Sequence, residues 1–276
     1  MATAVDNPFR FFSLHVVRTA RLGPSLVRVT FGGEELRHFH SDGYDQSLSL
    51  FLPHPGQAGP RVPVELGEGW WQGWRELPDG VRAVMRSYTL RALRREPDEI
   101  DVDFVLHEPA GHASEWAGRA AAGDRVVLLG PAVADNRAIR FRPPEDTDLV
   151  VLWGDGTALP AIAAILEALP DGLPARVWLE THDPGDVMDL TAPADTEITW
   201  LVAEGGQGSP MALDALRDAR LPAAGHPYVW IAGESAAVKA LRRHFVRERG
   251  IDRRRVTFVG YWRQGLTEEQ LREQGE

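Results

Sequence analysis

Short runs of alternating hydrophobic and polar residues dominate the first half of the chain. They are rich in β-branched and aromatic residues, are separated by Gly, Pro and Asp, and fall at residues 11–17, 26–31, 48–52, 81–90, 100–106 and 125–129. Short strands punctuated by turn residues are typical of a small antiparallel barrel. The pattern therefore predicts a six-stranded antiparallel barrel, with one short helix over 113–122 before the last strand.

The pattern changes after Pro143-Pro144-Glu145-Asp146, which we take as the boundary between two domains. Beyond it, strands of buried type alternate with amphipathic helices, which predicts βα units on a parallel sheet. The expected strands are 149–153, 177–181, 198–202, 228–232 and 256–261, and the expected helices are 159–169, 211–219 and 235–249. We thus expect a β domain over 1–143, an α/β domain over 147–263 and a tail over 264–276 that is a short surface helix or frayed. The stretch 67–78, rich in Trp and Gly, predicts an irregular loop.

The amino-acid composition limits the chemistry that this chain can carry out. A chain of 276 residues suits two domains, and 43% hydrophobic residues can fill two cores. The absence of cysteine excludes disulfides, thiolate metal sites, cysteine nucleophiles and iron–sulfur clusters bound through cysteine. Any redox chemistry therefore requires a bound organic cofactor.

Charge and the N-terminal sequence bear on partners and location. A net charge of −10 argues against nucleic acid and anionic membranes as partners, because both select basic faces. The segment 1–6 lacks a basic start and a long apolar stretch, and no apolar run reaches the length that spans a bilayer. We expect a cytoplasmic protein, acting as a monomer on a small molecule.

Two stretches supply what a flavin dinucleotide needs. The first is Arg86-Ser87-Tyr88-Thr89, and the second runs from His107 to Gly111-His112-Ala113-Ser114. An arginine fork fits a phosphate, a tyrosine ring can lie on an isoalloxazine, and a threonine hydroxyl can bond its edge. The second stretch leads into a helix start, where free N–H groups favour a pyrophosphate. The alternative is a purely structural role, with an ordinary Arg and Tyr on a sheet and a histidine that is hydrogen-bonded to the backbone.

These stretches resemble the flavin signatures of the ferredoxin–NADP reductase superfamily. The fuller text, Asp103 to His107, Ala113 to Ala117 and Gly130-Pro131, is similar to one branch of it, the siderophore-interacting proteins, which are flavin-dependent ferric-siderophore reductases. The resemblance extends from Gly32-Gly33 to Gly260-Tyr261-Trp262-Arg263 and implies an FAD-binding barrel followed by a nicotinamide-binding α/β domain. Arg86 would meet the FAD phosphates, Tyr88 would stack on the ring system, and Thr89 would face N5. The implied catalytic residues are Tyr88 and Thr89, and the implied flavin-binding residues are Arg86, Ser87, Tyr88, Thr89, Asp103, His107, Gly111, Ala113 and Ser114.

The second domain carries a glycine-rich turn, Gly154-Asp155-Gly156-Thr157-Ala158-Leu159-Pro160, between its first strand and helix. Such a turn lets the backbone approach a pyrophosphate at the carboxyl edge of the sheet. Relatives usually carry glutamate where this chain has Gly156. By resemblance the corner at Gly233-Glu234 borders the nicotinamide, and Trp262 shields the flavin; simple helix capping and edge packing are the alternatives. The implied nicotinamide-binding residues are Gly154, Asp155, Thr157, Ala158, Pro160, Gly233, Glu234 and Trp262.

Charge also bears on the choice of nicotinamide. Acids surround the position where the adenosine ribose is expected, and no basic residue lies between Arg176 and Arg217. These acids are Glu180, Asp183, Asp186 and Asp189. Because a 2′-phosphate calls for Arg or Lys, we expect NAD(P)H with a preference for NADH. His38 and His40, near Asp42 and Asp45, lack a third ligand on a shared face, so we predict a solvated loop and no metal site.

The implied reaction passes electrons from NAD(P)H through FAD to a ferric siderophore and releases Fe(II). Relatives hold the anionic chelate with cationic side chains, but the corresponding positions, Ser49, Ala132 and Thr257, are uncharged here. Arg91, Arg137, Arg140 or Arg263 could substitute. Two alternatives therefore stay open: an FAD-dependent reductase for another small-molecule acceptor, and a non-catalytic FAD-binding protein on the same fold.

Overall fold

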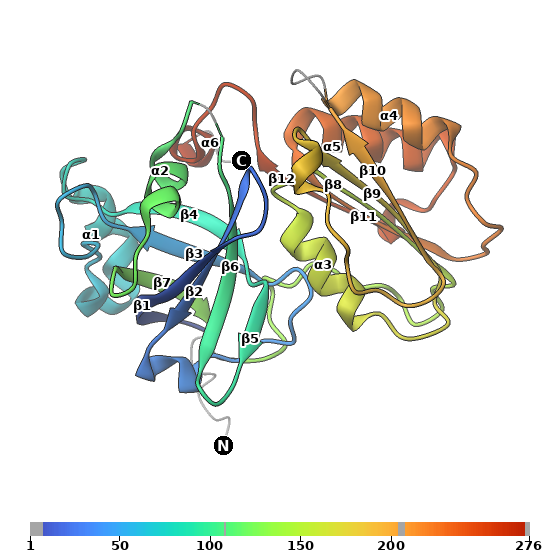
Figure 1. Ribbon diagram of the computed structural model, residues 1–276. Coiled ribbons are helices and arrows are strands. Elements are labelled where there is room, and N and C mark those ends of the chain that lie inside the picture. Colours follow the sequence, from blue (N-terminus) through green and yellow to red (C-terminus); the bar gives the residue numbers. More distant parts are fainter. Residues whose placement is uncertain (1–7, 108, 204–207, 274–276) are drawn as a thin grey trace. The chain divides into compact units, whose positions relative to one another are not determined.

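One unit of antiparallel strands and one of alternating strands and helices make up the chain (Figure 1). The computed structural model describes residues 8–107, 109–203 and 208–273. By internal contacts the chain divides into Met1–Ile139 and Arg140–Glu276. Residues 1–6 and the last three residues of the predicted tail lie outside the described residues.

The first unit is built on a seven-stranded sheet in the order β4-β3-β7-β1-β2-β6-β5, with antiparallel pairs throughout. Its strands are β1 (Phe9–Arg21), β2 (Leu26–Gly32), β3 (Ser47–Leu52), β4 (Val84–Thr89), β5 (Ala92–Arg94), β6 (Glu99–Val105) and β7 (Arg125–Pro131). Six of these confirm the predicted strands. The seventh, β5, was missed because three residues are too few to show a period.

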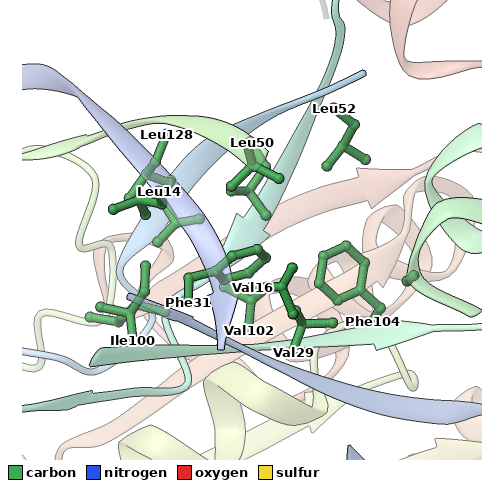
Figure 2. Packing of buried hydrophobic residues seen from close by; sticks show 14 of the residues in the cluster. Leu14, Val16, Val29, Phe31, Leu50, Leu52, Ile100, Val102, Phe104 and Leu128 are labelled. Carbon is green, nitrogen blue, oxygen red and sulfur yellow. The ribbon is translucent and has the colours of Figure 1, made fainter. Parts of the chain in front are cut away.

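The sheet curls around one apolar core. Alternate residues point inward, among them Val29 and Phe31 on β2 and Val102 and Phe104 on β6 (Figure 2). The ring of Tyr88 on β4 lies 4.3 Å from the ring of Phe104, centroid to centroid. Since β4 and β5 end the strand order, the sheet is a half-barrel that curls until β4 approaches β6 without pairing with it.

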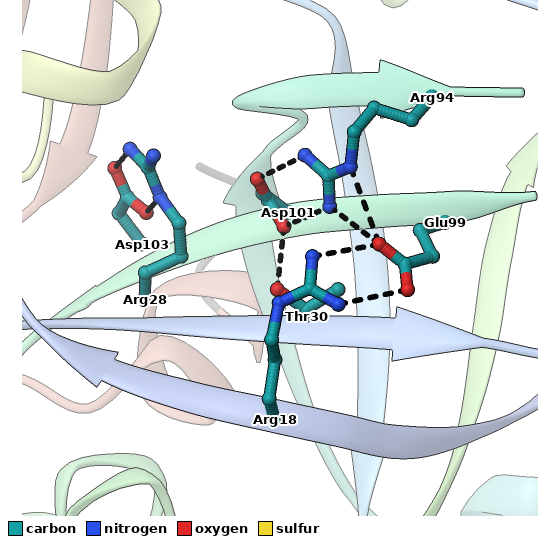
Figure 3. A network of polar contacts seen from close by, with 7 residues as sticks. All are labelled: Arg18, Arg28, Thr30, Arg94, Glu99, Asp101 and Asp103. Atoms are coloured by element: carbon teal, nitrogen blue, oxygen red, sulfur yellow. Dashed lines mark hydrogen bonds and ion pairs between the residues drawn. The ribbon is translucent and has the colours of Figure 1, made fainter. Parts of the chain in front are cut away.

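The other face of β2 and β6 carries a network of arginines and carboxylates (Figure 3). Arg94 of β5 donates to both Glu99 and Asp101, and Arg18 donates to both oxygens of Glu99 at 2.8 and 2.7 Å. Burial by itself would raise the pKa of Asp101, but the hydrogen bonds from Arg94 and Thr30 bring it below its usual range. Paired charges thus hold the short strand β5 in place.

Four helical elements belong to the described part of this unit: 3₁₀ turns at Glu34–His38 and Val64–Gly69, α1 (Trp70–Glu76) and α2 (His112–Arg119). The loop predicted over 67–78 is wrong, since α1 and the preceding 3₁₀ turn (Val64–Gly69) occupy it. Tertiary packing explains the error: Trp70 and Trp74 fold onto Phe51 in a second apolar cluster. The indole N–H of Trp74 donates to the carbonyl of Ala83 at 3.1 Å.

The second unit is a five-stranded parallel sheet in the order β10-β9-β8-β11-β12. Its strands are β8 (Leu149–Gly154), β9 (Ala175–Thr181), β10 (Thr196–Val202), β11 (Pro227–Glu234) and β12 (Val256–Trp262). Its helices are α3 (Leu159–Ala168), α4 (Gly208–Asp218), α5 (Ser235–Arg243) and α6 (Glu268–Glu273), with a π-helical segment over His244–Glu248 and 3₁₀ turns at Pro184–Asp186 and Arg253–Arg255. The predicted α/β class is confirmed, and the predicted helix 235–249 continues from α form into π form.

The two faces of this sheet are covered by different helices (Figure 1). Odd-numbered residues of β8, such as Val151 and Trp153, pack with residues of α4 and α5 in one cluster. Gly154 faces α3, where a β-carbon would stand 2.6 Å from that of Ala158. Among the described residues no helix is long and apolar enough to cross a membrane.

Candidate active site

The residues Arg86 to Thr89 all lie on β4, an edge strand of the half-barrel. With a period of two, Arg86 and Tyr88 share one face. Tyr88 is half-buried and packs on the core through Phe104. Ser87 is exposed and pairs with Ser49 of β3, and Thr89 is buried. The strand therefore presents a guanidinium and a supported phenol ring side by side.

The N-terminus of α2 is the second part of this site. Gly111 caps the helix with extended backbone and provides no side-chain hydrogen bond to its first turn. The helix packs against β4 and β6. Burial lowers the pKa of His112, and the charges of His54, Arg86 and Arg119 lower it further, against a hydrogen bond to the Pro53 carbonyl. The start of α2 and the arginine thus belong to neighbouring elements, because α2 packs against β4, the strand that carries Arg86.

His107, Ser114 and Ala113 surround this turn. The backbone N–H of His107 donates to the hydroxyl of Ser114 at 3.2 Å, and His107 Nδ1 lies 2.9 Å from the Pro109 carbonyl oxygen. The His107 side chain is exposed, whereas Ala113 and Ser114 are buried. Ser114 therefore ties the end of β6 to the first turn of α2 and fixes the shape of the turn.

Asp103, a predicted flavin-binding residue, does not lie on the same face of the sheet as Tyr88. It lies on the face of β6 opposite Phe104, and Arg28 holds both of its oxygens at 2.7 and 2.8 Å (Figure 3). The alternation of the strand separates it from Tyr88, because residues 103 and 104 must point to opposite sides of the sheet. Its contacts in this structure are those of a structural ion pair.

In the second unit, Asp155 joins three strands at the carboxyl edge of the sheet. Its Oδ1 accepts from the backbone N–H of Thr157 at 2.9 Å and from the Thr157 hydroxyl. Its Oδ2 accepts from the N–H of Glu234 at 2.8 Å and from the indole N–H of Trp262 at 2.7 Å. Asp155 is buried, and burial raises its pKa against these four bonds. The predicted residues Asp155, Thr157, Glu234 and Trp262 thus form one hydrogen-bonded group.

The corner between β11 and α5 is shaped around this carboxylate. Gly233 has φ +144°, and a β-carbon there would stand 2.5 Å from Asp155 Oδ2, so only glycine fits. Glu234 caps α5 by accepting hydrogen bonds from the N–H groups of Ala236 and Ala237. This is the helix-capping role that the sequence offered as the alternative to nicotinamide binding. Trp262 remains 38% exposed beside the same corner.

The turn after β8 leads directly into α3. Ala158 is its cap, is fully buried, and has no capping side chain, while Pro160 stands in the first turn. Proline suits that position because its missing N–H has no helical partner there. Gly154, Ala158 and Pro160 therefore shape this helix start, where the N–H groups of Thr157, Ala158 and Leu159 already donate to Asp155.

Glu180 near the end of β9 is a second buried acid of this edge. It is only 6% exposed, and its Oε2 has no hydrogen-bond partner among the described residues. Burial and the nearby charge of Asp155 raise the pKa of Glu180 to about 7. The sequence placed an acid here, but only the fold shows that it is buried beside Asp155.

The structure also shows where the three uncharged positions lie that correspond, by resemblance, to the chelate-binding cations of relatives. Ser49 lies on β3, Ala132 follows β7, and the Thr257 hydroxyl lies 2.7 Å from the hydroxyl of Tyr228. Arg137 lies over the ring of Phe9 at 5.7 Å. Where a solvated loop was predicted, His38 ends a 3₁₀ turn and Asp45 is buried, while both His38 and His40 are exposed. The described residues contain no group of three metal-binding side chains.

The chain thus combines an antiparallel half-barrel, which carries the Arg-x-Tyr-Thr strand, with a parallel-sheet α/β domain, which carries the glycine-rich turn. Residues 15–135 match the model of the siderophore-interacting FAD-binding domain, and residues 147–265 match that of the siderophore-interacting protein. The chain belongs to the siderophore-interacting protein family.

Individual relatives are similar to this chain over nearly its whole length. The ferric vibriobactin reductase ViuB of Vibrio cholerae is 30% identical over 263 residues, covering 95% of this chain and 92% of ViuB. The NADPH-dependent ferric-chelate reductase of Escherichia coli is 32% identical over 265 residues, covering 94% and 95%. The crystal structure of the siderophore-interacting protein SipS from Aeromonas hydrophila aligns with a TM-score of 0.79 at 30% identity, covering 97% of each chain.

Proposed function

We propose that this protein is an FAD-dependent reductase that passes electrons from a nicotinamide dinucleotide to a ferric siderophore and releases Fe(II). The observation that carries the proposal is the convergence of Arg86, Tyr88 and the uncapped start of α2 on one side of the half-barrel. The two ferric-chelate reductases among the relatives support the same acceptor class. We assign FAD to the first unit and the nicotinamide to the second.

The residues of the first unit fit the flavin. Arg86 would meet the pyrophosphate with its planar fork, and the free N–H groups at Gly111 and His112 would complete the anion site. Tyr88, held from behind by Phe104, would lie against the ring system, and Thr89 would bond its edge. Ser114 keeps His107 near the turn as a binding residue. Bound FAD would supply the step from two-electron donor to one-electron acceptor.

Release of the metal follows from its coordination chemistry. Hard oxygen ligands hold Fe(III) tightly and Fe(II) poorly, so reduction of the substrate weakens its complex. The protein must therefore orient the chelate and needs no acid of its own. His112 suits such a site, since its lowered pKa leaves it neutral near pH 7.

We infer that the nicotinamide dinucleotide is bound at the carboxyl edge of the second sheet, with a preference for NADH. The start of α3 would face the pyrophosphate, and Glu180, at the end of the next strand, is placed where an acid accepts from ribose hydroxyls. Its unpartnered Oε2 supports this role, because a ribose hydroxyl would satisfy it. Above about pH 7, where Glu180 is ionised, a 2′-phosphate would meet it as a like charge.

One observation favours a second acceptor class. Ser49 and Ala132 are uncharged, and the Thr257 hydroxyl is engaged by Tyr228, so the usual cationic set is missing. An FAD-dependent reductase for another small molecule is therefore the alternative, and a non-catalytic FAD-binding protein is a more distant one. Monomeric state and cytoplasmic location stay predictions.

Anaerobic stopped-flow mixing of the FAD-loaded protein tests the function. We expect NADH to bleach the flavin band roughly tenfold faster than NADPH at equal subsaturating concentration, as a repulsion of about 1.4 kcal/mol would give. A ferric catecholate or hydroxamate should then restore the band while a chelator captures Fe(II). Bleaching without reoxidation would support another acceptor, and no bleaching would support the non-catalytic protein.

Replacing Arg86 with alanine should weaken FAD binding roughly 30-fold, or about 2 kcal/mol, because a charge-assisted fork to phosphate is lost. Arg86→Lys should recover little of this, since lysine lacks the planar fork. Flavin fluorescence titration measures both. Arg125→Ala, an exposed arginine on β7, is the matched control and should bind FAD normally. Equal affinity of Arg86→Ala and the control would remove Arg86 from the site.

A further inference from the structure

A stripe of basic side chains runs along α5 and the π-helical segment. Lys239, Arg242, Arg243 and Arg247 line one cavity together with Val246 and with Phe258 of β12. Their spacing of three and four residues places the helical members on one side, opposite the core residues Val238, Leu241 and Phe245. The cavity measures about 410 Å³, which is within the range of small-molecule sites.

This cavity is separate from the dinucleotide edge of the same unit. The helix α5 begins at that edge, beside Gly233 and Asp155, and runs back along the sheet. Ser235 at its start faces Gly260, whereas Arg242 near its end lies over Phe258. Phe258 also points to the face of α4 and α5, since it pairs with Ile231 of their cluster. The cavity therefore lies nearer the amino edge of β12.

The arginines here are not neutralised by acids. Arg242, Arg243 and Arg247 make no ion pair with any residue that the structure describes. The nearby Glu248 is taken by Arg217 and by His244, and these partners lower the pKa of Glu248 to about 2. In a chain of net charge −10, this concentration of unpaired positive charge is a local exception.

Arg242 carries a buried hydrogen-bond donor that has no acceptor among the described residues. Its guanidinium carbon lies 4.4 Å from the centre of the Phe258 ring, a cation–π contact. Its Nε is buried and has no acceptor among the described residues. A buried donor without an acceptor costs free energy, so an anionic ligand that reached Nε would remove a penalty. Phe258 is 44% exposed and offers an apolar wall beside it.

We propose that this cavity binds a small molecule carrying a diphosphate group. Three arginine forks match phosphate oxygens in pairs, and their three positive charges offset most of the charge of a diphosphate. The concave shape favours a small ligand over a membrane surface, which needs no cavity. The site goes beyond the proposed reductase reaction, and its occupancy can be measured without turnover.

Calorimetric titration of the FAD-loaded protein, with NAD⁺ saturating, tests the site with inorganic pyrophosphate, ADP and citrate. The variant is Arg243→Gln with Arg247→Gln, both exposed, and the matched control is Arg61→Gln with Arg220→Gln, two exposed arginines outside the cavity. We expect pyrophosphate to bind the wild type and the control, and to bind the variant at least roughly tenfold more weakly. Arg242→Lys, which keeps the charge and loses Nε, should also weaken binding.

Three results would overturn the assignment, and a fourth would support it. Equal pyrophosphate affinity in the variant and the control would place the ion elsewhere. Citrate bound more tightly than pyrophosphate would indicate a carboxylate ligand. Binding confined to phosphatidylserine-containing vesicles, with no small anion bound, would indicate a membrane surface. ADP bound with pyrophosphate affinity and lost in the variant would support a nucleotide as the source of the diphosphate.

Discussion

Replacing Asp155 with alanine is expected to destabilise the carboxyl edge of the second sheet by about 4 kcal/mol. The carboxylate accepts four hydrogen bonds, and three of their donors come from backbone or from the Trp262 indole. Each bond to a charged group contributes about 1.5–3 kcal/mol, and donors left buried add a desolvation penalty. The sum is reduced because Trp262, at 38% exposure, can turn to water.

Hydrogen exchange followed by mass spectrometry measures this effect locally. A loss of about 4 kcal/mol corresponds to exchange roughly a thousandfold faster in β8, β11 and the start of α5. Asp171→Ala, an exposed aspartate in a turn of the same unit, should leave exchange unchanged. Protection equal to wild type in Asp155→Ala would mean that the carboxylate does not hold the corner.

The variant Asp155→Asn separates the effect of the negative charge on stability from the effect of the hydrogen-bond geometry. Both carboxylate oxygens accept two bonds each, so an asparagine amide group must face two donors whichever way it turns. We expect about half the loss of the alanine variant. In either variant, hydride transfer from the nicotinamide should slow, because the Gly233–Glu234 corner loses its anchor.

Glu180 is expected to make the second unit less stable as pH rises. Its folded pKa of about 7 exceeds the usual 4.5, so the folded state binds the proton more tightly than the unfolded chain does. Stability from this proton is complete below pH 4.5 and is lost as pH rises through 7. The whole loss is about 3 kcal/mol, of which about 2 kcal/mol falls between pH 5.5 and 8.5.

Glu180→Gln should remove this dependence, since an amide resembles the protonated acid. The free energy of unfolding in urea, followed by tryptophan fluorescence, should exceed that of the wild type by an amount that grows with pH. The discrimination against NADPH should shrink in the same variant. Glu145→Gln, at an exposed position, should follow the wild type at every pH. A constant difference between Glu180→Gln and wild type would show that Glu180 does not titrate in this range.

Local patterns predicted most of the fold because they are local in origin. Six of the strands in the half-barrel alternate every two residues, and the buried strands of the second unit are continuous apolar runs. Of the elements that were missed, β5 is too short to show a period and is held by ion pairs to the adjacent strand, and α1 depends on a partner further away in the chain. Arg94 reaches Glu99 and Asp101 through ion pairs, and Trp70 packs on Phe51.

The sequence by itself determined which residue types were available to bind a flavin and a nicotinamide, through Arg86-Ser87-Tyr88-Thr89, the start of α2 and the turn after β8. Tertiary structure decided what each of them touches. It turned Asp103 to the outer face toward Arg28, enclosed Asp155 among four donors, and buried Glu180 beside that carboxylate. The physical reason is that hydrogen bonds, burial and pKa shifts arise between residues far apart in the chain, which no single stretch of sequence encodes.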